Sequence, residues 1–418
     1  MSGEDRKRIA IVGAGISGLV TAHLLHRRYD VTVFEAASHI GGHTYTVPVA
    51  DGDRELAVDM GFIVYNDRTY PNFIRLLDEL DVATEASDMS FSVSCGRTGL
   101  EYCGSSLDQL FAQRRNLVRF SFYRMLVGIL RFHKRAPRLL QADPRLSLGE
   151  YLDQERYSRP FVDHYLIPMI SAIWSTEPQR MLEFPVRTLA SFLDNHGMLT
   201  VSDRPQWRVV TGGSSSYVGR LTAPLDGRIH AGTPVERVRR DPGGVDVKLK
   251  DGETARFDAV VFAAHSDQAL ALLDDPTPAE REVLGAIPYQ MNDVVLHTDR
   301  SLLPRRERAW ASWNYHLDPA EAQGTQVTYY MNRLQNLESS EHYCVTLNRT
   351  EAIDPERILH RKRFAHPLFT AASTDAKARW HDVSTDRTFY CGAYWGFGFH
   401  EDGVKSGIRV AETLGAGD

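Results

Sequence analysis

A glycine-rich turn near the N-terminus constrains the fold of this chain more than any other feature of its sequence. Residues 7–12 form a short apolar run rich in β-branched side chains, and residues 13–18, with the sequence GAGISG, follow it directly. The pattern GxGxxG between a strand and a helix allows a tight turn, a close backbone approach to a pyrophosphate and close packing of the helix on the strand. A helix predicted over residues 18–28 then directs its N-terminal N–H groups and positive dipole end towards that pyrophosphate.

The next segment completes a βαβ unit. Residues 31–35 (VTVFE) read as a second strand, and this order requires a parallel sheet with a right-handed crossover. Glu35 ends that strand, 17 residues after Gly18. A carboxylate there accepts hydrogen bonds from ribose hydroxyls and repels a 2′-phosphate. The unit therefore predicts a dinucleotide-binding site.

A second glycine pair indicates which dinucleotide is bound. Gly41, Gly42, His43 and Thr44 follow Glu35 within nine residues. A flavin nucleotide is extended enough to pass a second backbone loop, so this pair favours FAD over NAD. His43 could donate to a phosphate or a ribityl oxygen, or it could simply be exposed in a loop turn. The chain has no second GxGxxG followed by an acid, which argues against a separate nicotinamide domain.

Composition excludes several other classes of protein. A chain of 418 residues suggests about two or three domains. Its net charge of -6 gives no footprint for nucleic acid. The four cysteines are scattered with no CxxC pair, so we expect neither a metal site nor a disulfide framework, and a reducing cytoplasmic setting. The first apolar run is too short for a signal peptide, and no stretch is long enough to predict a transmembrane helix.

The rest of the chain alternates between helical and strand-rich regions. Residues 103–145 look mainly helical, and residues 148–200 look helical with proline interruptions at Pro160, Pro168, Pro178 and Pro185. Residues 228–265 read as short strands separated by Asp-Gly and Gly-Gly turns. Further strands are predicted at 291–299, 309–315, 326–332, 343–348 and 389–396, and a closing helix at about 402–414.

The predicted fold class is α/β. A Rossmann-type domain for FAD, of the kind called GR2-like, would be built from residues 1–85, 205–285 and 385–418. An interleaved α+β substrate domain would take residues 86–204 and 286–384. Its helical part would span 103–200, and a second, mixed sheet would span 286–350.

These motifs resemble the flavin amine oxidase superfamily, which includes monoamine oxidases, protoporphyrinogen oxidases and phytoene desaturases. Four more stretches carry the resemblance. Residues 59–63 resemble the segment beneath the flavin ring, and residues 211–217 resemble a Gly-Gly turn that precedes a helix. Residues 233–235 resemble the strand whose valine meets the adenine. Residues 391–407 resemble the closing flavin motif, where a second helix N-terminus reaches the flavin.

The resemblance implies FAD held without a covalent bond, because the sequence around Cys391 lacks the usual pattern of a flavin-linking cysteine. The family typically has arginine where His43 stands, so this chain departs from the pattern there. The residues assigned to the cofactor are Gly13, Ala14, Gly15, Ile16, Ser17, Gly18, Glu35, Ala36, Gly41, Gly42, His43, Thr44, Gly61, Phe62, Ile63, Val235, Gly392, Glu401, Asp402, Gly403 and Val404.

A closer resemblance covers nearly the whole chain. Residues 204–218, 309–315, 327–335 and 390–407 are similar to a bacterial flavoprotein group often encoded beside cyclopropane-fatty-acyl synthases; a similar segment is fused to such synthases in plants. Polyenoic fatty acid isomerases are also similar in architecture. This resemblance implies a lipid or fatty-acyl substrate, and a lipid methyltransferase as partner, by association only.

Aromatic residues crowd two predicted strands and the segment after them. Trp313, Tyr315 and Trp395 are the candidate substrate-binding residues, and Phe397 and Phe399 follow close behind. In this superfamily such aromatics often wall the cavity above the flavin, although ordinary sheet core explains them equally well. An apolar wall would favour an alkyl or polyene chain over a small polar amine.

His400, Glu401 and Asp402 precede the closing helix. His400 is the candidate catalytic residue, because imidazole can move a proton near physiological pH; hydrogen bonding to the cofactor or to a loop is the alternative. Asp402 is expected as the N-cap of the helix, a structural role. Glu401 is expected in the first turn or just outside it.

Residues 114–138 form a basic amphipathic segment. Its apolar stripe has helical spacing and consists of Val118, Phe122, Met125, Ile129 and Phe132. Its basic arc consists of Arg115, Arg119, Arg124, Arg131, Lys134, Arg135 and Arg138. Four further apolar residues fall on or near this arc, namely Phe120, Tyr123, Val127 and Leu130. The segment is either a surface helix of the substrate domain or a peripheral membrane contact.

Three functions remain open at this point. The first is an FAD-dependent oxidoreductase acting on a lipid acyl chain by dehydrogenation, desaturation or double-bond isomerisation. The second is an amine or porphyrinogen-type oxidase. The third is an FAD-bound partner subunit of a lipid-modifying methyltransferase, with no turnover of its own.

Overall fold

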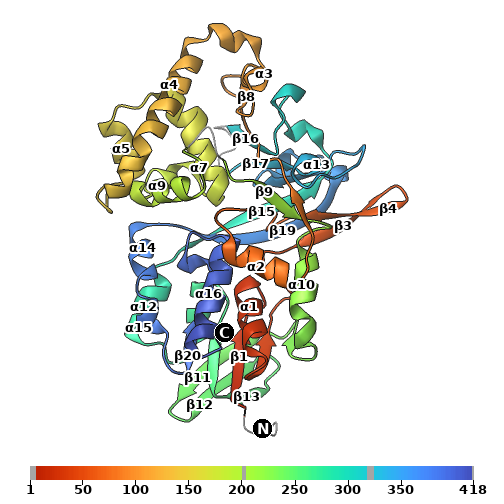
Figure 1. Cartoon of the computed structure of the whole chain (residues 1–418), viewed down its shortest axis with the longest axis vertical. Helices are drawn as coiled ribbons and strands as arrows, with labels where there is room; N and C mark the ends of the chain where they lie inside the picture. The colour runs from red at the N-terminus through yellow and green to blue at the C-terminus, as the bar shows by residue number, and fades with distance from the viewer. Residues whose placement is uncertain (1–5, 200–203, 318–323, 417–418) are drawn as a thin grey trace.

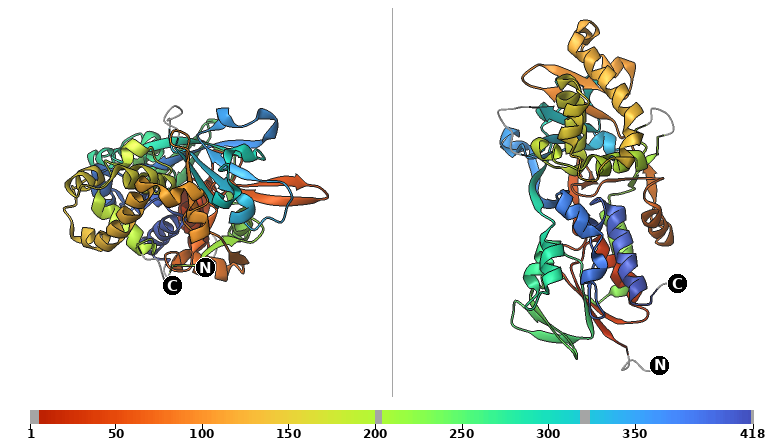
Figure 2. Two further views of the ribbon diagram at one scale, coloured as in Figure 1. Left: turned by 90° about the horizontal axis from the view of Figure 1, so that it is seen from above. Right: turned by 90° about the vertical axis from the view of Figure 1, so that its left-hand side faces the viewer.

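The structure is a computed structural model that describes residues 6–199, 204–317 and 324–416. The molecule is elongated, with both termini near one end and a group of helices at the other (Figures 1 and 2). Residue 200, which closes the predicted helical part, and the outermost residues of the predicted terminal ranges lie outside the described residues.

A five-stranded parallel sheet forms the end that carries the termini (Figure 1). Its order is β10-β2-β1-β14-β20, with β1 at Arg8–Val12, β2 at Asp30–Phe34, β10 at Ile229–His230, β14 at Ala259–Phe262 and β20 at Thr388–Tyr390. An antiparallel sheet of β11 (Val235–Asp241), β12 (Gly244–Leu249) and β13 (Thr254–Phe257) contacts β1 and β14. The predicted parallel βαβ unit is confirmed.

Two helices pack on each other at the carboxyl edge of this sheet through glycine. Helix α1 spans Ile16–Leu25 and α16 spans His400–Thr413. A Cβ at Gly403 would lie 2.7 Å from Ile16 Cγ2, and one at Gly407 would lie 2.6 Å from the carbonyl oxygen of Ser17. No real side chain tolerates such approaches, so glycine at these positions lets the two helices come together with their N-termini near each other.

A seven-stranded mixed sheet forms the middle of the molecule, in the order β19-β15-β18-β17-β16-β7-β8. These strands are β7 (Phe91–Cys95), β8 (Leu100–Cys103), β15 (Tyr289–His297), β16 (Trp313–Leu317), β17 (Val327–Tyr330), β18 (Cys344–Leu347) and β19 (Ile358–Pro367). All neighbours are antiparallel except β16 and β7. The predicted second, mixed sheet is confirmed.

Several predicted strand limits within this pattern are wrong. The strand predicted at 309–315 begins only at Trp313, because residues 307–309 form a short 3-10 turn, η6. The one predicted at 326–332 ends at Tyr330, where helix α13 (Met331–Leu334) begins. The one predicted at 389–396 stops at Tyr390, and a 3-10 turn, η9 (Ala393–Trp395), follows. Strands β7, β8 and β19 lie outside the predicted sheet range of 286–350.

The helical part lies above the mixed sheet at the end of the molecule (Figure 1). It contains α3 (Leu107–Leu110), η1 (Arg114–Val118), α4 (Phe120–Arg135), η2 (Ala136–Gln141), α5 (Leu148–Gln154), α6 (Arg159–Phe161), α7 (Ile167–Trp174), α8 (Pro178–Met181) and α9 (Val186–Asn195), with a π-turn at Val162–Leu166. The helix predicted across 114–138 is thus divided. Arg119 has extended backbone between η1 and α4, so Val118 leaves the expected stripe and is exposed.

Proline explains how this part is fastened to the mixed sheet. Pro168 has no N–H to donate to the carbonyl four residues earlier, that of His164. The hydroxyl of Tyr102, on β8, donates to this carbonyl oxygen at 2.7 Å. A proline interruption seen in the sequence therefore becomes an anchor between helix and sheet.

Smaller elements connect the two sheets. They are the hairpin β3 (Thr46–Asp51) and β4 (Arg54–Asp59), the sheet β5-β9-β6 (Val64–Asn66, Trp207–Val210, Thr84–Ala86), and helices α2 (Pro71–Glu79) and α10 (Ser215–Thr222). Helices α11 (Ser266–Leu272), α12 (Pro278–Gly285), α14 (Ala371–Lys377) and α15 (Trp380–Val383) pack beside the parallel sheet. Trp380 and Val383 belong to the core of that sheet, although the predicted boundary at 384 assigns them to the other domain.

Candidate functional site

The glycine turn after β1 is shaped for a ligand. Gly13 has a φ of +111°, and its N–H donates to the carbonyl oxygen of Phe34 at 2.8 Å. Gly18 is required by the protein itself, because a Cβ there would lie 2.1 Å from the carbonyl oxygen of Gly13. Gly15 differs: an added Cβ would meet only Gly42 Cα, at 4.0 Å. The protein leaves room for a side chain at residue 15, so the need for glycine there arises from a ligand whose phosphates approach the backbone.

Glu35 lies at the carboxyl end of β2, beside this turn. Its carboxylate accepts from the N–H of Ala14 at 2.8 Å and from the N–H of Ala37 at 2.9 Å. The N–H of Thr233 donates to its main-chain carbonyl oxygen at 2.8 Å, which places residues 233–235 next to it. The carboxyl edge of a parallel sheet is where α/β proteins bind nucleotides. Glu35, the glycine turn and residues 233–235 therefore meet at one place, as the sequence predicts. Ala36 lies between Glu35 and Ala37, whose N–H binds the Glu35 carboxylate.

Gly41 and Gly42, the second glycine pair, lie against the glycine turn after β1. The N–H of Gly41 donates to the carbonyl oxygen of Ala14 at 2.8 Å, and a Cβ at Gly42 would lie 3.0 Å from Gly15 Cα. Gly42 has a φ of +62° and is exposed, so its backbone stays open to a ligand. Two glycine-lined backbone loops thus face one another, as the sequence predicts for FAD.

His43 belongs to a group of histidines that the sequence did not bring together. Its ring centroid lies 5.3 Å from that of His366, on β19, and 6.1 Å from that of His265, the N-cap of α11. Burial lowers the pKa of His43 to about 4, and the pKa values of His265 and His366 fall to about 4 and about 3 for the same reason. These imidazoles are neutral at pH 7, so His43 does not supply the positive charge that the family's arginine would.

His400 begins α16 and is buried. Its ring stacks on that of Phe62 with centroids 3.7 Å apart, and its Nε2 lies 2.7 Å from the hydroxyl of Tyr217. That hydroxyl lies 2.6 Å from Oγ1 of Thr44. Burial lowers the pKa of His400 to about 3, which makes it neutral at pH 7. The contacts link Thr44, Phe62 and the start of α16; a catalytic role for His400 stays a prediction.

The two acids after His400 bind protein groups. The predicted N-cap at Asp402 is wrong, because Phe399 is the N-cap and Asp402 is the third residue of the helix. Its Oδ2 accepts from the N–H groups of Phe397 and Phe399 at 2.9 and 3.0 Å. Glu401 lies in the first turn and accepts from the N–H groups of Asn72 and Phe73, at the start of α2. Both carboxylates hold loops in place around the helix N-terminus.

The remaining residues of the closing motif support the same region. The N–H of Gly392 donates to Oγ of Ser406 at 3.0 Å, and Val404 is fully packed in the core beside the parallel sheet. Cys391 is buried, and burial raises the pKa of its thiol to about 12. A protonated, enclosed thiol suits packing and does not suit a covalent link.

A buried carboxylate joins the nucleotide end to the mixed sheet. Asp59, at the end of β4, accepts from the N–H and hydroxyl of Ser214, from the hydroxyl of Thr46 and from the amide of Gln335. Burial raises its pKa to about 7, and these hydrogen bonds limit the rise. Gly61 lies two residues after Asp59, and its lack of a side chain lets its backbone approach the carbonyl oxygen of His43. That oxygen accepts from the N–H of Phe62 at 2.7 Å. Ile63 is packed in the core of the mixed sheet.

The structure does not bring the three predicted substrate residues together. Trp313 and Tyr315 pack in the core of the mixed sheet, where Trp313 meets Tyr329 edge to face with centroids 4.8 Å apart. Tyr315 is only 1% exposed. Trp395 packs instead in the core of the parallel sheet. Ordinary core packing explains these positions, and substrate contact by any of the three stays a prediction.

A different aromatic cluster adjoins the site, and sequence reasoning missed most of it. Phe399, the residue before His400, stacks on Phe192 with centroids 5.0 Å apart, and Phe192 lies 4.5 Å from Trp174. We call this group the aromatic cluster; its members are Trp174, Phe184, Phe192, Phe369, Phe397 and Phe399. Phe397 and Phe399 remain partly exposed. The other four come from distant segments of the chain, so no local pattern could have grouped them.

Comparisons with known proteins agree with this geometry. The sequence model of a family described as flavin containing amine oxidoreductase matches residues 16–414. The L-amino acid dehydrogenase of Synechocystis sp. is 21% identical over 295 residues, which is 66% of this chain and 60% of that protein. The chain thus spans less than two thirds of the length of this curated relative.

Two solved structures share the fold over nearly the whole chain. Cyclohexylamine oxidase from Brevibacterium oxydans IH-35A has a TM-score of 0.70 and 16% identity, covering 98% of this chain and 99% of its own. A fatty acid isomerase from P. acnes that produces CLA has a TM-score of 0.72 and 16% identity, covering 99% and 100%. At such identities the likeness shows a common fold.

None of the helices formed by the described residues has the length and apolar character needed to cross a membrane. The same residues contain no group of three or more His, Cys, Asp or Glu side chains placed to hold a metal ion.

Proposed function

The chain belongs to the flavin containing amine oxidoreductase family and is an FAD-dependent oxidoreductase, and we propose that it acts on the acyl chain of a fatty acid or another lipid. The superfamily predicted from the sequence is confirmed by this membership. The choice of substrate rests on the aromatic cluster.

The residues present fit FAD. The open position beside Gly15, the carboxylate of Glu35 and the exposed backbone of Gly42 would hold the diphosphate and the ribose, and the N-termini of α1 and α16 would face its negative charge. When bound, FAD supplies an acceptor for a hydride, which carries two electrons, from the substrate. The buried contacts of Phe62 and His400 would keep water from that end of the cofactor.

The observation that carries the proposal is the continuity between the cofactor residues and the aromatic cluster. Phe399 is adjacent in sequence to His400 and packs against Phe192, so the cluster begins where the cofactor residues end. Trp174 donates its Nε1–H to the carbonyl oxygen of Phe397 at 3.3 Å, and this hydrogen bond holds the loop at Phe397 against α7. An aromatic and apolar wall binds an alkyl chain by excluding water from both surfaces.

Charged groups of both signs lie beside this cluster. Nζ of Lys377 lies 3.8 Å from the ring centroid of Phe369 and donates to the carbonyl oxygen of Gly396 at 2.6 Å. Burial lowers the pKa of Lys377 to about 7, so the group is partly charged at neutral pH. Asp402 lies beside the same loop, where its carboxylate accepts from the N–H groups of Phe397 and Phe399, so the charges at the cluster do not choose between a fatty acid and an amine.

The three neutral histidines His43, His265 and His366 set a limit on proton transfer. With pKa values of about 3 to 4 they are unprotonated at pH 7 and do not act as acids there. Forming a double bond removes a hydride and a proton from the acyl chain: FAD would accept the hydride, and a neutral imidazole would accept the proton as a base. Dehydrogenation, desaturation and double-bond isomerisation all remain within reach of such a site.

The test is anaerobic mixing of the flavin-loaded protein with branched, cyclopropane and unsaturated fatty acids, followed by absorbance spectroscopy and mass spectrometry. We expect at least one acyl substrate to bleach the flavin, or to change its double-bond position without bleaching. If no acyl lipid does either, the proposal fails.

Two other outcomes identify the alternatives. Release of hydrogen peroxide with a panel of amines, and none with lipids, would assign an amine oxidase. Tight association with a lipid methyltransferase, together with a flavin that no substrate reduces, would assign a supporting subunit.

A further inference from the structure

Exposed apolar side chains are concentrated at the helical end of the molecule. Ten large hydrophobic residues are exposed among the described residues, and seven of them lie between residues 107 and 130. We call these seven the apical patch: Leu107, Leu117, Val118, Phe120, Tyr123, Val127 and Leu130. They belong to α3, η1 and α4, which lie at the extreme end of the long axis (Figures 1 and 2).

Helix α4 is apolar on two faces. Its inner face, formed by Phe122, Met125 and Phe132, is buried against the helical part and the mixed sheet. Its outer face carries four of the patch residues at spacings of three, four and three, which place them on one stripe. Phe120 is 76% exposed, and Val127 and Leu130 are 64% and 65% exposed. A folded protein in water gains nothing from such a stripe, so it indicates a surface that is covered in use.

The charge around the patch identifies what covers it. Residues 107–138 contain eight Lys or Arg residues and one Asp, although the whole chain carries a net charge of -6. Arg124, Lys134 and Arg138 are exposed, and no ion pair with another described residue engages them. Arg114 pairs with Asp108, while Arg131 and Arg135 share Glu155. Three free cations therefore border an apolar stripe, which is the pattern of a helix that lies in an anionic membrane surface.

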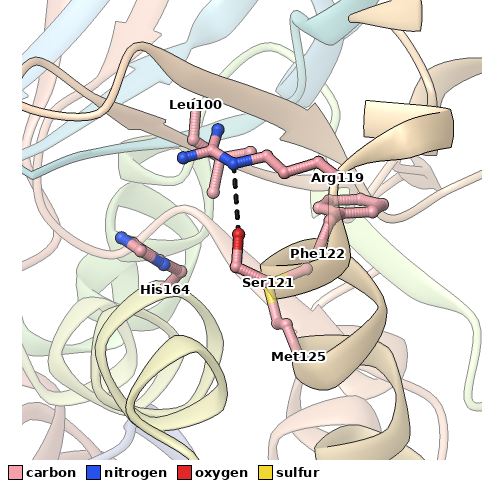
Figure 3. A pocket seen from close by; sticks show the side chains of 6 residues that line it. All are labelled: Leu100, Arg119, Ser121, Phe122, Met125 and His164. Carbon is pink, nitrogen blue, oxygen red and sulfur yellow. Dashed lines mark hydrogen bonds between the residues drawn. The ribbon is translucent and has the colours of Figure 1, made fainter. Parts of the chain in front are cut away.

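Figure 3 shows that one arginine of this region faces inward and does not belong to the border. Nε of Arg119 donates to Oγ of Ser121 at 3.2 Å, and its guanidinium lies in a small pocket with Leu100 and His164. The fold at Arg119 turns the chain from η1 into α4. Leu117 and Val118 before this turn and Phe120 after it are all exposed.

A second cationic surface lies beside the patch. Arg115, Arg305 and Arg306 line a surface cavity of about 450 Å³, in which Glu101 binds Arg306. Turn η6, which follows Arg306, packs against α3. The positive surface thus extends past the apolar stripe on the side of α3 and can contact lipid phosphates around the inserted side chains.

We infer that the apical patch is a membrane-docking surface that inserts its apolar side chains among the headgroups of an anionic bilayer. The exposed cations at its border bind lipid phosphates, and the parallel sheet points away from the membrane. This inference does not depend on the substrate, because it rests on exposure and charge at the end of the molecule farthest from the termini.

The experiment is co-sedimentation of the flavin-loaded full chain with vesicles of phosphatidylglycerol and phosphatidylcholine, compared with vesicles of phosphatidylcholine alone. We expect binding to the anionic vesicles that weakens at least tenfold between low and high salt. The double variant Val127→Glu and Leu130→Glu should lose this binding, because it places charge in the stripe. A second variant, Arg124→Gln with Lys134→Gln and Arg138→Gln, should weaken binding to anionic vesicles several-fold and reduce the salt dependence.

The matched control is Met291→Glu with Leu359→Glu, which charges two exposed apolar residues elsewhere on the surface. It should bind vesicles as the wild type does. Flavin content and thermal unfolding are measured for every variant, and all should match the wild type. Wild-type protein that ignores anionic vesicles, or a control that loses binding equally, would overturn the inference. Self-association or capture of a protein partner that is lost only in Val127→Glu with Leu130→Glu would overturn it too, by giving the patch a different occupant.

Discussion

Helices pack differently at the nucleotide end and at the helical end of the molecule. At the nucleotide end, α1 and α16 meet through glycines whose absent side chains allow backbone to approach backbone within van der Waals distance. At the helical end, α4 packs one apolar face and leaves the other exposed. The first arrangement tolerates almost no change and serves a fixed ligand. The second has room for variation, and it is there that we propose contact with a membrane surface.

The largest expected effect is that of Gly18→Val, at the nucleotide end. Its Cβ would lie 2.1 Å from the carbonyl oxygen of Gly13 and 2.9 Å from Ala263 Cβ, so either the turn or the helix must move. We expect a loss of more than about 4 kcal/mol, enough to prevent folding. The measurement is the yield of soluble protein and its circular dichroism. Gly219→Ala, in α10 with open space around its Cβ, is the control and should fold at least as well as the wild type.

Asp59→Asn tests the buried hydrogen bonds that connect the nucleotide end to the mixed sheet. The carboxylate is surrounded by donors, and an amide would set its own N–H groups against them, so we expect a loss of about 2–3 kcal/mol. Burial raises the pKa of Asp59 to about 7, above its ordinary value, so the folded state retains a proton that the unfolded state releases. The contribution of this residue to stability is therefore present at low pH and falls as pH rises from about 4 to about 7.

Urea unfolding at several pH values measures this effect. The wild type should lose on the order of 1 kcal/mol per pH unit across that window through Asp59, and Asp59→Asn should lose this slope. An unchanged slope in the variant would show that Asp59 is ionised throughout.

Glu35→Gln should act on the cofactor alone. The variant keeps the shape of the side chain but removes the charge that Ala14 N–H and the ribose hydroxyls would share. We expect FAD to bind about tenfold more weakly, corresponding to about 1.4 kcal/mol, with unfolding of the FAD-free protein little changed. Fluorescence titration of apoprotein with FAD measures the dissociation constant. Equal affinity in the two proteins would remove Glu35 from the site.

The smallest expected effect belongs to the aromatic cluster. Phe399→Leu keeps an apolar side chain but removes the stacking on Phe192. We expect KM for an acyl substrate to rise several-fold while flavin content stays at the wild-type level. Phe257→Leu is the matched control, because Phe257 lies in β13 and makes its edge-to-face contact with Phe34 in the core of the parallel sheet. A larger effect from the control than from Phe399→Leu would move the substrate site away from the cluster.

The sequence predicts the nucleotide end well because its constraints are local. Gly13, Gly15, Gly18 and Glu35 lie within one βαβ unit, and their spacing alone dictates a turn, a helix start and a strand end. The mixed character of the second sheet has another origin, because its one parallel pair joins β16 to β7, from distant parts of the chain. The strand limits failed where short turns of 3-10 helix interrupt apolar runs, as they do before Trp313 and after Tyr390.

The histidines and aromatic residues beyond the nucleotide turn could not be predicted from the sequence in this way. His265 and His366 meet His43 across three segments that are far apart in the chain, and Trp174 meets Phe192 and Phe399 only through tertiary packing. Aromatic density in the sequence pointed to Trp313 and Tyr315, which the fold uses as core. Composition cannot separate a residue that lines a site from one that fills a sheet.

The most direct test of this account is the flavin content of Gly15→Ala. Its Cβ has room in the protein but occupies the space that a diphosphate needs. We predict a folded, colourless protein, whose circular dichroism matches that of the wild type and whose bound FAD falls at least tenfold, while Gly219→Ala remains fully yellow. A Gly15→Ala protein that carries as much FAD as the wild type would contradict the assignment of this turn to the cofactor.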